Sequence, residues 1–168
     1  MIVRPPPLSL LVPTNARHLQ SCLLNINALT SQVKMAMLED FVRQHEIDFL
    51  FLQDVTQPKF DNLRGYTAYT NIDMNRRGTA ILAREHLPLT QIVSLPFGRG
   101  IAASFQGVRL VNIYAPLGAE KRQKREDFFN LELPYLLIDT PTTLIMGTIT
   151  IASSPKQTLQ ATSTSVEP

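Results

Sequence analysis

Two asparagines stand at alternate positions where an apolar run of the sequence ends. Asn25 and Asn27 lie in the string LLNINAL, residues 23–29. Side chains two positions apart on a strand share a face, so both amides can point to the same side. Asparagine also satisfies backbone groups where a strand gives way to a turn, and the local sequence by itself favours that role. The pair is a candidate site, and the turn interpretation stays open beside it.

A carboxylate follows a second apolar run. Gln53 and Asp54 come directly after the string FLFL. Open sheets bind ligands at the carboxyl ends of their strands, and a carboxylate placed there can hold a hard cation such as magnesium. Taken alone, an aspartate at such a point is more commonly a turn residue or a helix cap. Both interpretations of Asp54 therefore remain.

Two basic clusters are candidates for contacting phosphate. Arg76 and Arg77 can grip phosphate through charge-assisted hydrogen bonds, although a solvated turn explains them equally well. The second cluster is a basic helix start formed by Lys121, Arg122, Lys124 and Arg125. It can meet a nucleic-acid backbone or form a solvated helix face paired with its own acidic residues. The net charge of the chain is only +2, too small by itself to indicate nucleic-acid binding.

Other metal and thiol chemistry is not indicated. The three histidines lack metal-ligand spacing, so no zinc site is predicted. The single cysteine, Cys22, excludes an internal disulfide, and its apolar surroundings predict a small buried thiol.

The candidate residues require particular elements to position them. Residues 19–26 and 47–52 are mostly apolar and predict two buried strands. Between them an amphipathic helix is predicted, with Ser31 as its N-cap. The result is a strand-helix-strand unit that brings the ends of the two strands together. Its apolar helix residues, at helical spacing, are Val33, Met37, Leu38, Phe41 and Val42.

Further strands are predicted downstream. The strings GTAILAR, GIAASFQ and VRLVNIYAP read as short strands, and a turn at Gly107 predicts a hairpin between the last two. Residues 119–133 predict a helix that ends near Pro134, and TTLIMG predicts another buried strand.

The composition predicts one domain between irregular ends. Residues 1–18 are rich in proline and predict an irregular leader, and residues 152–168 predict a disordered Ser/Thr-rich tail. The domain itself is expected over residues 19–151. The apolar stretch near the start is too short and too interrupted by proline for a membrane span, so we expect an intracellular protein without a membrane partner.

Five strings occur in one order over residues 19–150: LLNINAL, FLFLQDV, NRRGTAIL, LVNIYAP and LIMG. Together they resemble the apurinic-endonuclease-like domain of non-LTR retrotransposons, within the endonuclease/exonuclease/phosphatase superfamily. The resemblance implies an α/β fold that is part of a four-layer sandwich, with two packed mixed sheets flanked by helices and the C-terminal part missing. It implies an active site where the strands end, DNA as partner, magnesium as cofactor and a nuclear location.

The resemblance also implies roles for single residues. Asn25 matches the active-site asparagine of the family, Asn27 stands near its metal, and Tyr114 matches a tyrosine that contacts phosphate. Asp54 stands where the family has a metal-binding glutamate, so the carboxylate is retracted by one methylene. Magnesium demands near-ideal octahedral geometry, and we expect its binding to be weakened.

The chain departs from the family where LIMG ends. Relatives continue GDFN or GDLN, whereas Gly147 is followed here by Thr148, Ile149 and Thr150. Threonine cannot replace an aspartate that activates water near neutral pH, and the late Asp-His pair of the family has no match. We therefore expect an ancestral magnesium-dependent endonuclease that is catalytically defective. The alternatives are a non-catalytic nucleic-acid- or protein-binding module on the same fold and a still working nuclease.

Overall fold

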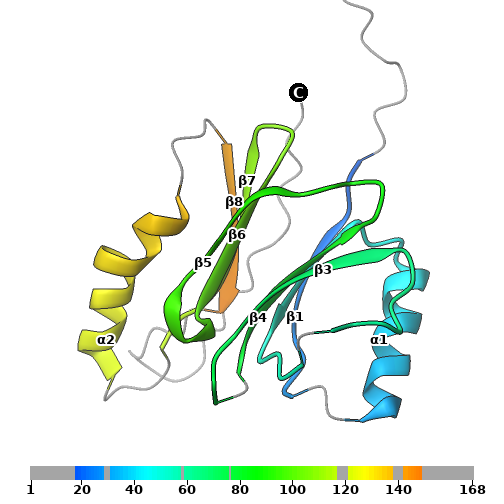
Figure 1. Ribbon diagram of the computed structural model, residues 1–168, viewed down its shortest axis with the longest axis horizontal. Helices are drawn as coiled ribbons and strands as arrows, with labels where there is room; N and C mark the ends of the chain where they lie inside the picture. Colours follow the sequence, from blue (N-terminus) through cyan, green and yellow to red (C-terminus); the bar gives the residue numbers. More distant parts are fainter. Residues whose placement is uncertain are drawn as a thin grey trace, which may run out of the picture.

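The computed structural model describes residues 18–28, 31–57, 59–75, 77–116, 121–137 and 142–148. Two four-stranded sheets lie face to face between two helical segments, which cover their outer sides (Figure 1). The predicted leader and tail lie outside the described residues, apart from His18. The elements are β1 (Ser21–Asn25), α1 (Gln32–Gln44), β2 (Phe49–Gln53), β3 (Tyr66–Ile72), β4 (Gly78–Arg84), β5 (Thr90–Ser94), η1 (Pro96–Gly98), β6 (Gly100–Phe105), β7 (Val108–Tyr114), α2 (Arg122–Asp127), η3 (Phe128–Glu132), η4 (Leu133–Leu136) and β8 (Thr142–Thr148).

Each sheet combines antiparallel strands with one parallel pair. The first has the order β1-β2-β4-β3, with β1 and β2 parallel and joined through α1. The second has the order β5-β6-β7-β8, with β7 and β8 parallel and the α2 segment between them in the chain. The predicted strand-helix-strand unit and the hairpin between β6 and β7 are both confirmed. At the hairpin, Gln106 and Gly107 both have positive φ, as a tight two-residue turn requires.

Helix α1 begins where the sequence predicts but buries a different face. The side chain of Ser31 accepts a hydrogen bond from the Lys34 N–H, which confirms the N-cap. Met35, Leu38 and Val42 are the buried residues, whereas Val33 and Met37 are about two-thirds exposed. The expectation that Val33 and Met37 face the core was wrong. Apolar residues at helical spacing lie on two adjacent faces of this helix. Which face is buried depends on its contact with the sheet, and the spacing by itself does not determine it.

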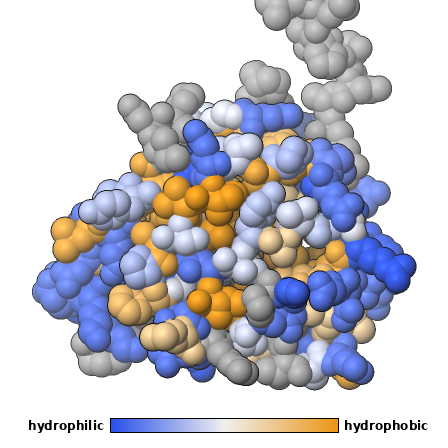
Figure 2. Space-filling model, viewed as in Figure 1, coloured by the Kyte–Doolittle hydropathy of each residue, from blue (hydrophilic) through white to orange (hydrophobic). Residues whose placement is uncertain are grey.

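Three apolar layers hold the sandwich together. Strand β2 is buried on both faces: Leu50 and Leu52 pack toward α1, whereas Phe49 and Phe51 pack between the sheets. On the other side, Phe128 and Leu136 of the α2–η4 segment pack on the outer face of the second sheet. Hydrophilic side chains cover both helical flanks in Figure 2, with apolar patches between them. This arrangement is the predicted four-layer α/β sandwich.

Two strands were not predicted from the sequence. Strand β5 is an exposed edge with an irregular register, and strand β3 is only half-buried, so neither has a clean alternation of apolar and polar residues. The predicted helix of residues 119–133 is found as α2 followed by a π turn and a 3-10 turn that ends at Leu136. No helix in the described residues is long and apolar enough to span a membrane.

Buried amide side chains cross the gap between the two sheets. The Asn112 side-chain amide donates to the carbonyl oxygens of Leu52 at 2.9 Å and Ala80 at 2.8 Å. In the opposite direction, the Gln53 amide donates to the Ile113 carbonyl at 2.5 Å. Asn112 and Gln53 are fully buried. These bonds form a polar seam that fixes how one sheet sits on the other.

Replacing Asn112 by alanine should destabilise the fold. The substitution leaves two buried carbonyl groups without this donor and opens a small cavity, which should lower the free energy of unfolding by about 2 kcal/mol. Urea denaturation followed by circular dichroism measures the change. Asn130→Ala, at an exposed position of η3, is the matched control and should change stability by less than about 0.5 kcal/mol. Equal midpoints for the two variants would contradict a structural role of the seam.

Candidate nucleic-acid interface

Several predicted site residues stand at the carboxyl ends of strands in the two sheets. Asn25 is the last residue of β1 and pairs with Gln53, the last residue of β2. In the other sheet, Tyr114 ends β7 and pairs with Thr148, the last residue of β8. In each sheet these residues lie at the carboxyl ends of a parallel strand pair, which is where open sheets bind ligands.

The two asparagines form a local turn. The Asn25 Oδ1 atom accepts the N–H of Asn27 at 3.0 Å. The Lys34 ammonium, reaching back from α1, donates to the carbonyl oxygens of Asn27 at 2.9 Å and Ala28 at 3.3 Å. Asn27 and Ala28 both have positive φ. Asn25 thus has the turn-forming role that was the alternative to a catalytic one. Its side-chain oxygen already accepts a backbone hydrogen bond.

Asp54 is held just below the surface at the end of β2. Its backbone has a φ of 57°, its exposed fraction is 5%, and its carbonyl oxygen accepts the N–H of Ala28. The carboxylate Oδ1 lies 3.7 Å from the Nε of Arg77. That oxygen has no hydrogen-bond partner within the described part of the chain. The carboxylate is therefore balanced by the guanidinium mainly through charge.

The expected magnesium site would rest on Asp54. Asp54 offers one carboxylate, and a second cation there would meet the charge of Arg77. Among the described residues, no three His, Cys, Asp or Glu side chains gather closely enough to hold a metal ion. The magnesium expectation gains no support from this arrangement.

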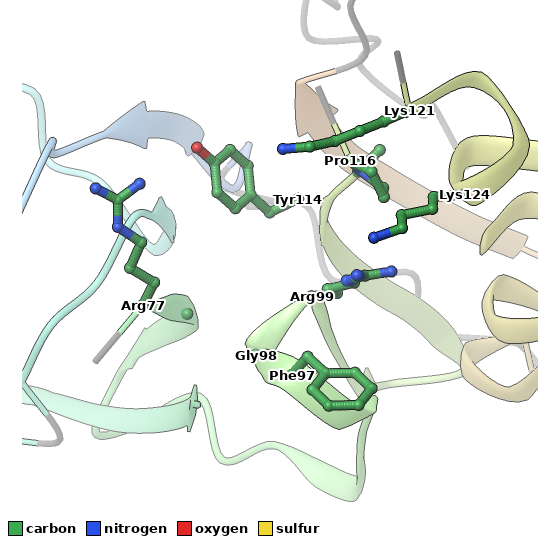
Figure 3. A pocket seen from close by; sticks show the side chains of 10 residues that line it. Arg77, Phe97, Gly98, Arg99, Tyr114, Pro116, Lys121 and Lys124 are labelled. Carbon is green, nitrogen blue, oxygen red and sulfur yellow. The ribbon is translucent and has the colours of Figure 1, made fainter. Parts of the chain in front are cut away.

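A basic pocket of about 460 Å³ opens beside this edge. Four cationic side chains line it: Arg77 precedes β4, Arg99 precedes β6, and Lys121 and Lys124 belong to the start of the α2 segment. Figure 3 shows Arg77 on one side of the Tyr114 ring and the two lysines and Arg99 on the other. Residues far apart in the sequence thus gather several positive charges around one hollow. The remaining lining residues are Gly78, Phe97, Gly98, Ala115 and Pro116.

One part of the pocket lining depends on close backbone packing at Gly98. This residue has a φ of 66°, and a Cβ atom there would lie 2.4 Å from the Arg77 carbonyl oxygen and 2.9 Å from the Gly78 Cα. The Thr79 hydroxyl donates to the Gly98 carbonyl at 3.3 Å. The loop of η1 is therefore seated directly on the chain that carries Arg77.

The sequence located part of this pocket. Four residues that were named from the sequence line it together: Arg77, Tyr114, Lys121 and Lys124. Arg122 instead forms an ion pair with Glu126 at 2.8 Å, outside the pocket lining. Arg76, Ile149 and Thr150 lie outside the described residues.

Phe97 and Arg99 were missed by the sequence reasoning. The only signal in the sequence is the string PFGRG, in which two glycines flank an arginine and follow a proline and an aromatic residue.

Comparison with solved structures identifies the architecture. An AP endonuclease from Archaeoglobus fulgidus matches with a TM-score of 0.62 and 18% identity, over 77% of this chain and 56% of that one. The 3′ phosphatase NExo from Neisseria, bound to a product DNA hairpin, matches with a TM-score of 0.65 and 22% identity, over 81% and 59%. TDP2 from Caenorhabditis elegans matches with a TM-score of 0.60 and 20% identity, over 79% and 46%.

The chain has the endonuclease/exonuclease/phosphatase fold. At these identities the likeness is one of fold, and the chain spans about half to three-fifths of the length of the solved proteins it matches. No protein-family model matches the sequence, and no curated protein matches it significantly. The resemblance drawn from five sequence strings therefore agrees with the fold.

Gly98→Ala should destabilise the protein more than Gly107→Ala. Both glycines have positive φ, which costs an alanine about 1–2 kcal/mol. Only at Gly98 does a Cβ atom also collide with backbone, whereas nothing lies within 4 Å of one at Gly107. We expect Gly107→Ala to lose about 1 kcal/mol and Gly98→Ala at least about twice that, measured by urea denaturation. Equal losses would show that the close approach at Gly98 does not matter.

Proposed function

We propose that this chain is an endonuclease-type domain of non-LTR retrotransposon origin, which binds a nucleic-acid backbone in the basic pocket and hydrolyses it poorly or not at all. The observation that carries the proposal is the gathering of Arg77, Arg99, Lys121 and Lys124 around one hollow at the end of the sheets. The chain as a whole is nearly neutral, so this concentration of charge is local.

The charges of the pocket are only partly compensated. Arg77 lies near Asp54, and Arg99 lies 3.4 Å from a carboxylate oxygen of Glu132. Within the described residues, Lys121 and Lys124 have no ion-pair partner. The described residues that line the pocket include no acidic side chain. A phosphodiester backbone supplies the missing negative charge and displaces counterions when it binds, which favours association at low salt.

The solved neighbours make DNA the first ligand to test. One is an AP endonuclease, and the NExo structure contains a product DNA hairpin. The pocket also has a hydroxyl donor in Tyr114, which projects between Arg77 and Lys121 (Figure 3). Arginine, lysine and tyrosine are common contacts of phosphate in nucleic-acid complexes.

Poor hydrolysis follows from the residues that stand at the chemistry-bearing positions. Thr148 pairs with Tyr114 at the end of β8, where the resembling endonucleases have an aspartate. A threonine hydroxyl does not act as a general base near neutral pH. Asp54 is partnered by Arg77, and the Asn25 side-chain oxygen is engaged in a turn. In this proposal the domain therefore keeps its binding of nucleic acid and has lost most of its hydrolytic activity.

Removing two pocket lysines should weaken DNA binding and its dependence on salt. We expect Lys121→Ala combined with Lys124→Ala to lower affinity for a labelled DNA duplex or single strand by tenfold or more at low salt. The slope of log affinity against log salt should fall by about 2. Fluorescence anisotropy at several salt concentrations measures both quantities.

The control removes the same amount of charge elsewhere. Arg43→Ala combined with Arg64→Ala takes away two exposed cations that do not line the pocket. This variant should bind nearly as the unmodified protein does. No binding by the unmodified protein at low salt, or the same loss in both double variants, overturns the proposed pocket function.

A further inference from the structure

We infer that Phe97 is a stacking platform for an unpaired nucleobase, so that the preferred ligand of the basic pocket is single-stranded nucleic acid. This inference rests on the proposed function, and it names the class of ligand that the same pocket takes. It begins from the unusual exposure of one aromatic ring. Phe97 is 68% exposed, whereas each of the other seven phenylalanines is buried or half-buried.

The backbone holds this ring in a costly conformation. Phe97 has a φ of 59° and a ψ of 25°, in the left-handed region that a bulky side chain rarely adopts. Such conformations persist where the surroundings enforce them, and they gather at binding sites. An exposed ring adds no packing energy to the core that could offset this backbone strain. The strained conformation is therefore explained better by a role for the aromatic side chain at the rim of the pocket.

The loop that displays the ring is fixed on both sides. The Leu95 N–H donates to the Gly100 carbonyl at 2.8 Å, and the Tyr114 N–H donates to the Arg99 carbonyl at 2.7 Å. The Asn71 amide donates to the carbonyl oxygens of both Leu95 and Gly100, at 2.7 and 2.8 Å. The ring is therefore presented by a braced loop, which lowers the entropic cost of ligand stacking.

A cation lies against the ring. The Arg99 guanidinium carbon lies over the Phe97 ring, 5.6 Å from its centroid, and the same guanidinium contacts Glu132. Figure 3 shows Phe97 and Arg99 together on one wall of the pocket, with the lysines on the same side of Tyr114. Phosphate held by these cations would bring the attached nucleoside to the rim where Phe97 lies.

An aromatic ring and a basic groove together select unpaired bases. Proteins that bind single strands combine cations along the backbone with exposed aromatic rings on which bases stack. Bases within a duplex are already stacked on each other, so their faces become available only in single strands, loops or frayed ends. Both DNA and RNA single strands present this chemistry.

Tryptophan substitution gives a direct optical test. The chain contains no tryptophan, so Phe97→Trp introduces one fluorophore at the platform. We expect its emission to be quenched by an oligothymidylate, and much less by an oligonucleotide of the same length in which every base is replaced by an abasic residue. Tyr135→Trp, at an exposed aromatic position outside the pocket, is the matched control and should respond to neither. Equal quenching by the two oligonucleotides overturns the inference.

Affinity measurements supply the second readout. Phe97→Ala should weaken binding of oligothymidylate by about tenfold, the loss typical of one stacked base. Its affinity for the abasic oligonucleotide should stay unchanged, and Phe97→Tyr should retain the affinity of the unmodified protein. Phe97 is exposed, so these variants should unfold at the same urea concentration as the unmodified protein, which circular dichroism checks.

The outcomes separate this inference from the proposed function. Salt-dependent oligonucleotide binding that is indifferent to Phe97→Ala refutes the stacking platform and leaves the basic pocket standing. Failure of the unmodified protein to bind either oligonucleotide at low salt refutes both. Tighter binding of a fully paired duplex than of the single strand also overturns the inference, because a duplex offers no free base.

Discussion

The buried amide seam between the two sheets is the constraint on which the rest of the structure depends. Asn112 of β7 donates to backbone oxygens of β2 and β4, and Gln53 of β2 donates back to β7. Apolar packing between sheets tolerates sliding, whereas hydrogen bonds between buried groups demand one register. The seam lies one or two residues from Asp54 and Tyr114. The same bonds that align the sheets therefore align the strand ends that carry the pocket.

The positive charge of the pocket comes from the residues that lie near these strand ends. Asp54 lies near Arg77 and Glu132 lies near Arg99, whereas Lys121 and Lys124 have no ion-pair partner in the described part of the chain. The hollow therefore keeps a surplus of positive charge. Gly98 lets the η1 loop sit on the backbone at Arg77, which places Phe97 and Arg99 opposite that residue. The proposed binding of phosphate and a base rests on the cationic and aromatic residues that line this hollow.

The sequence predicted the parts of the fold that have strong local patterns. Strands β2, β4, β6 and β7 are nearly continuous apolar runs, and Ser31 marks the start of α1, so both were found. Strands β3 and β5 and the buried face of α1 were missed because tertiary contacts decide them. For the site, the position of Tyr114 and Arg77 could be predicted. Phe97 and Arg99 could not, because their role arises from a loop conformation and from close contacts with residues distant in the sequence.

The central claim is that this fold binds nucleic acid without cutting it efficiently. The most direct test is nicking of supercoiled plasmid by the purified, folded chain with magnesium or manganese, beside the Asp54→Ala and Asn25→Ala variants and with binding to the same plasmid followed by gel shift. The account predicts retained binding and no nicking above the background of either variant. Metal-dependent nicking that disappears in both variants would contradict it and establish a working nuclease.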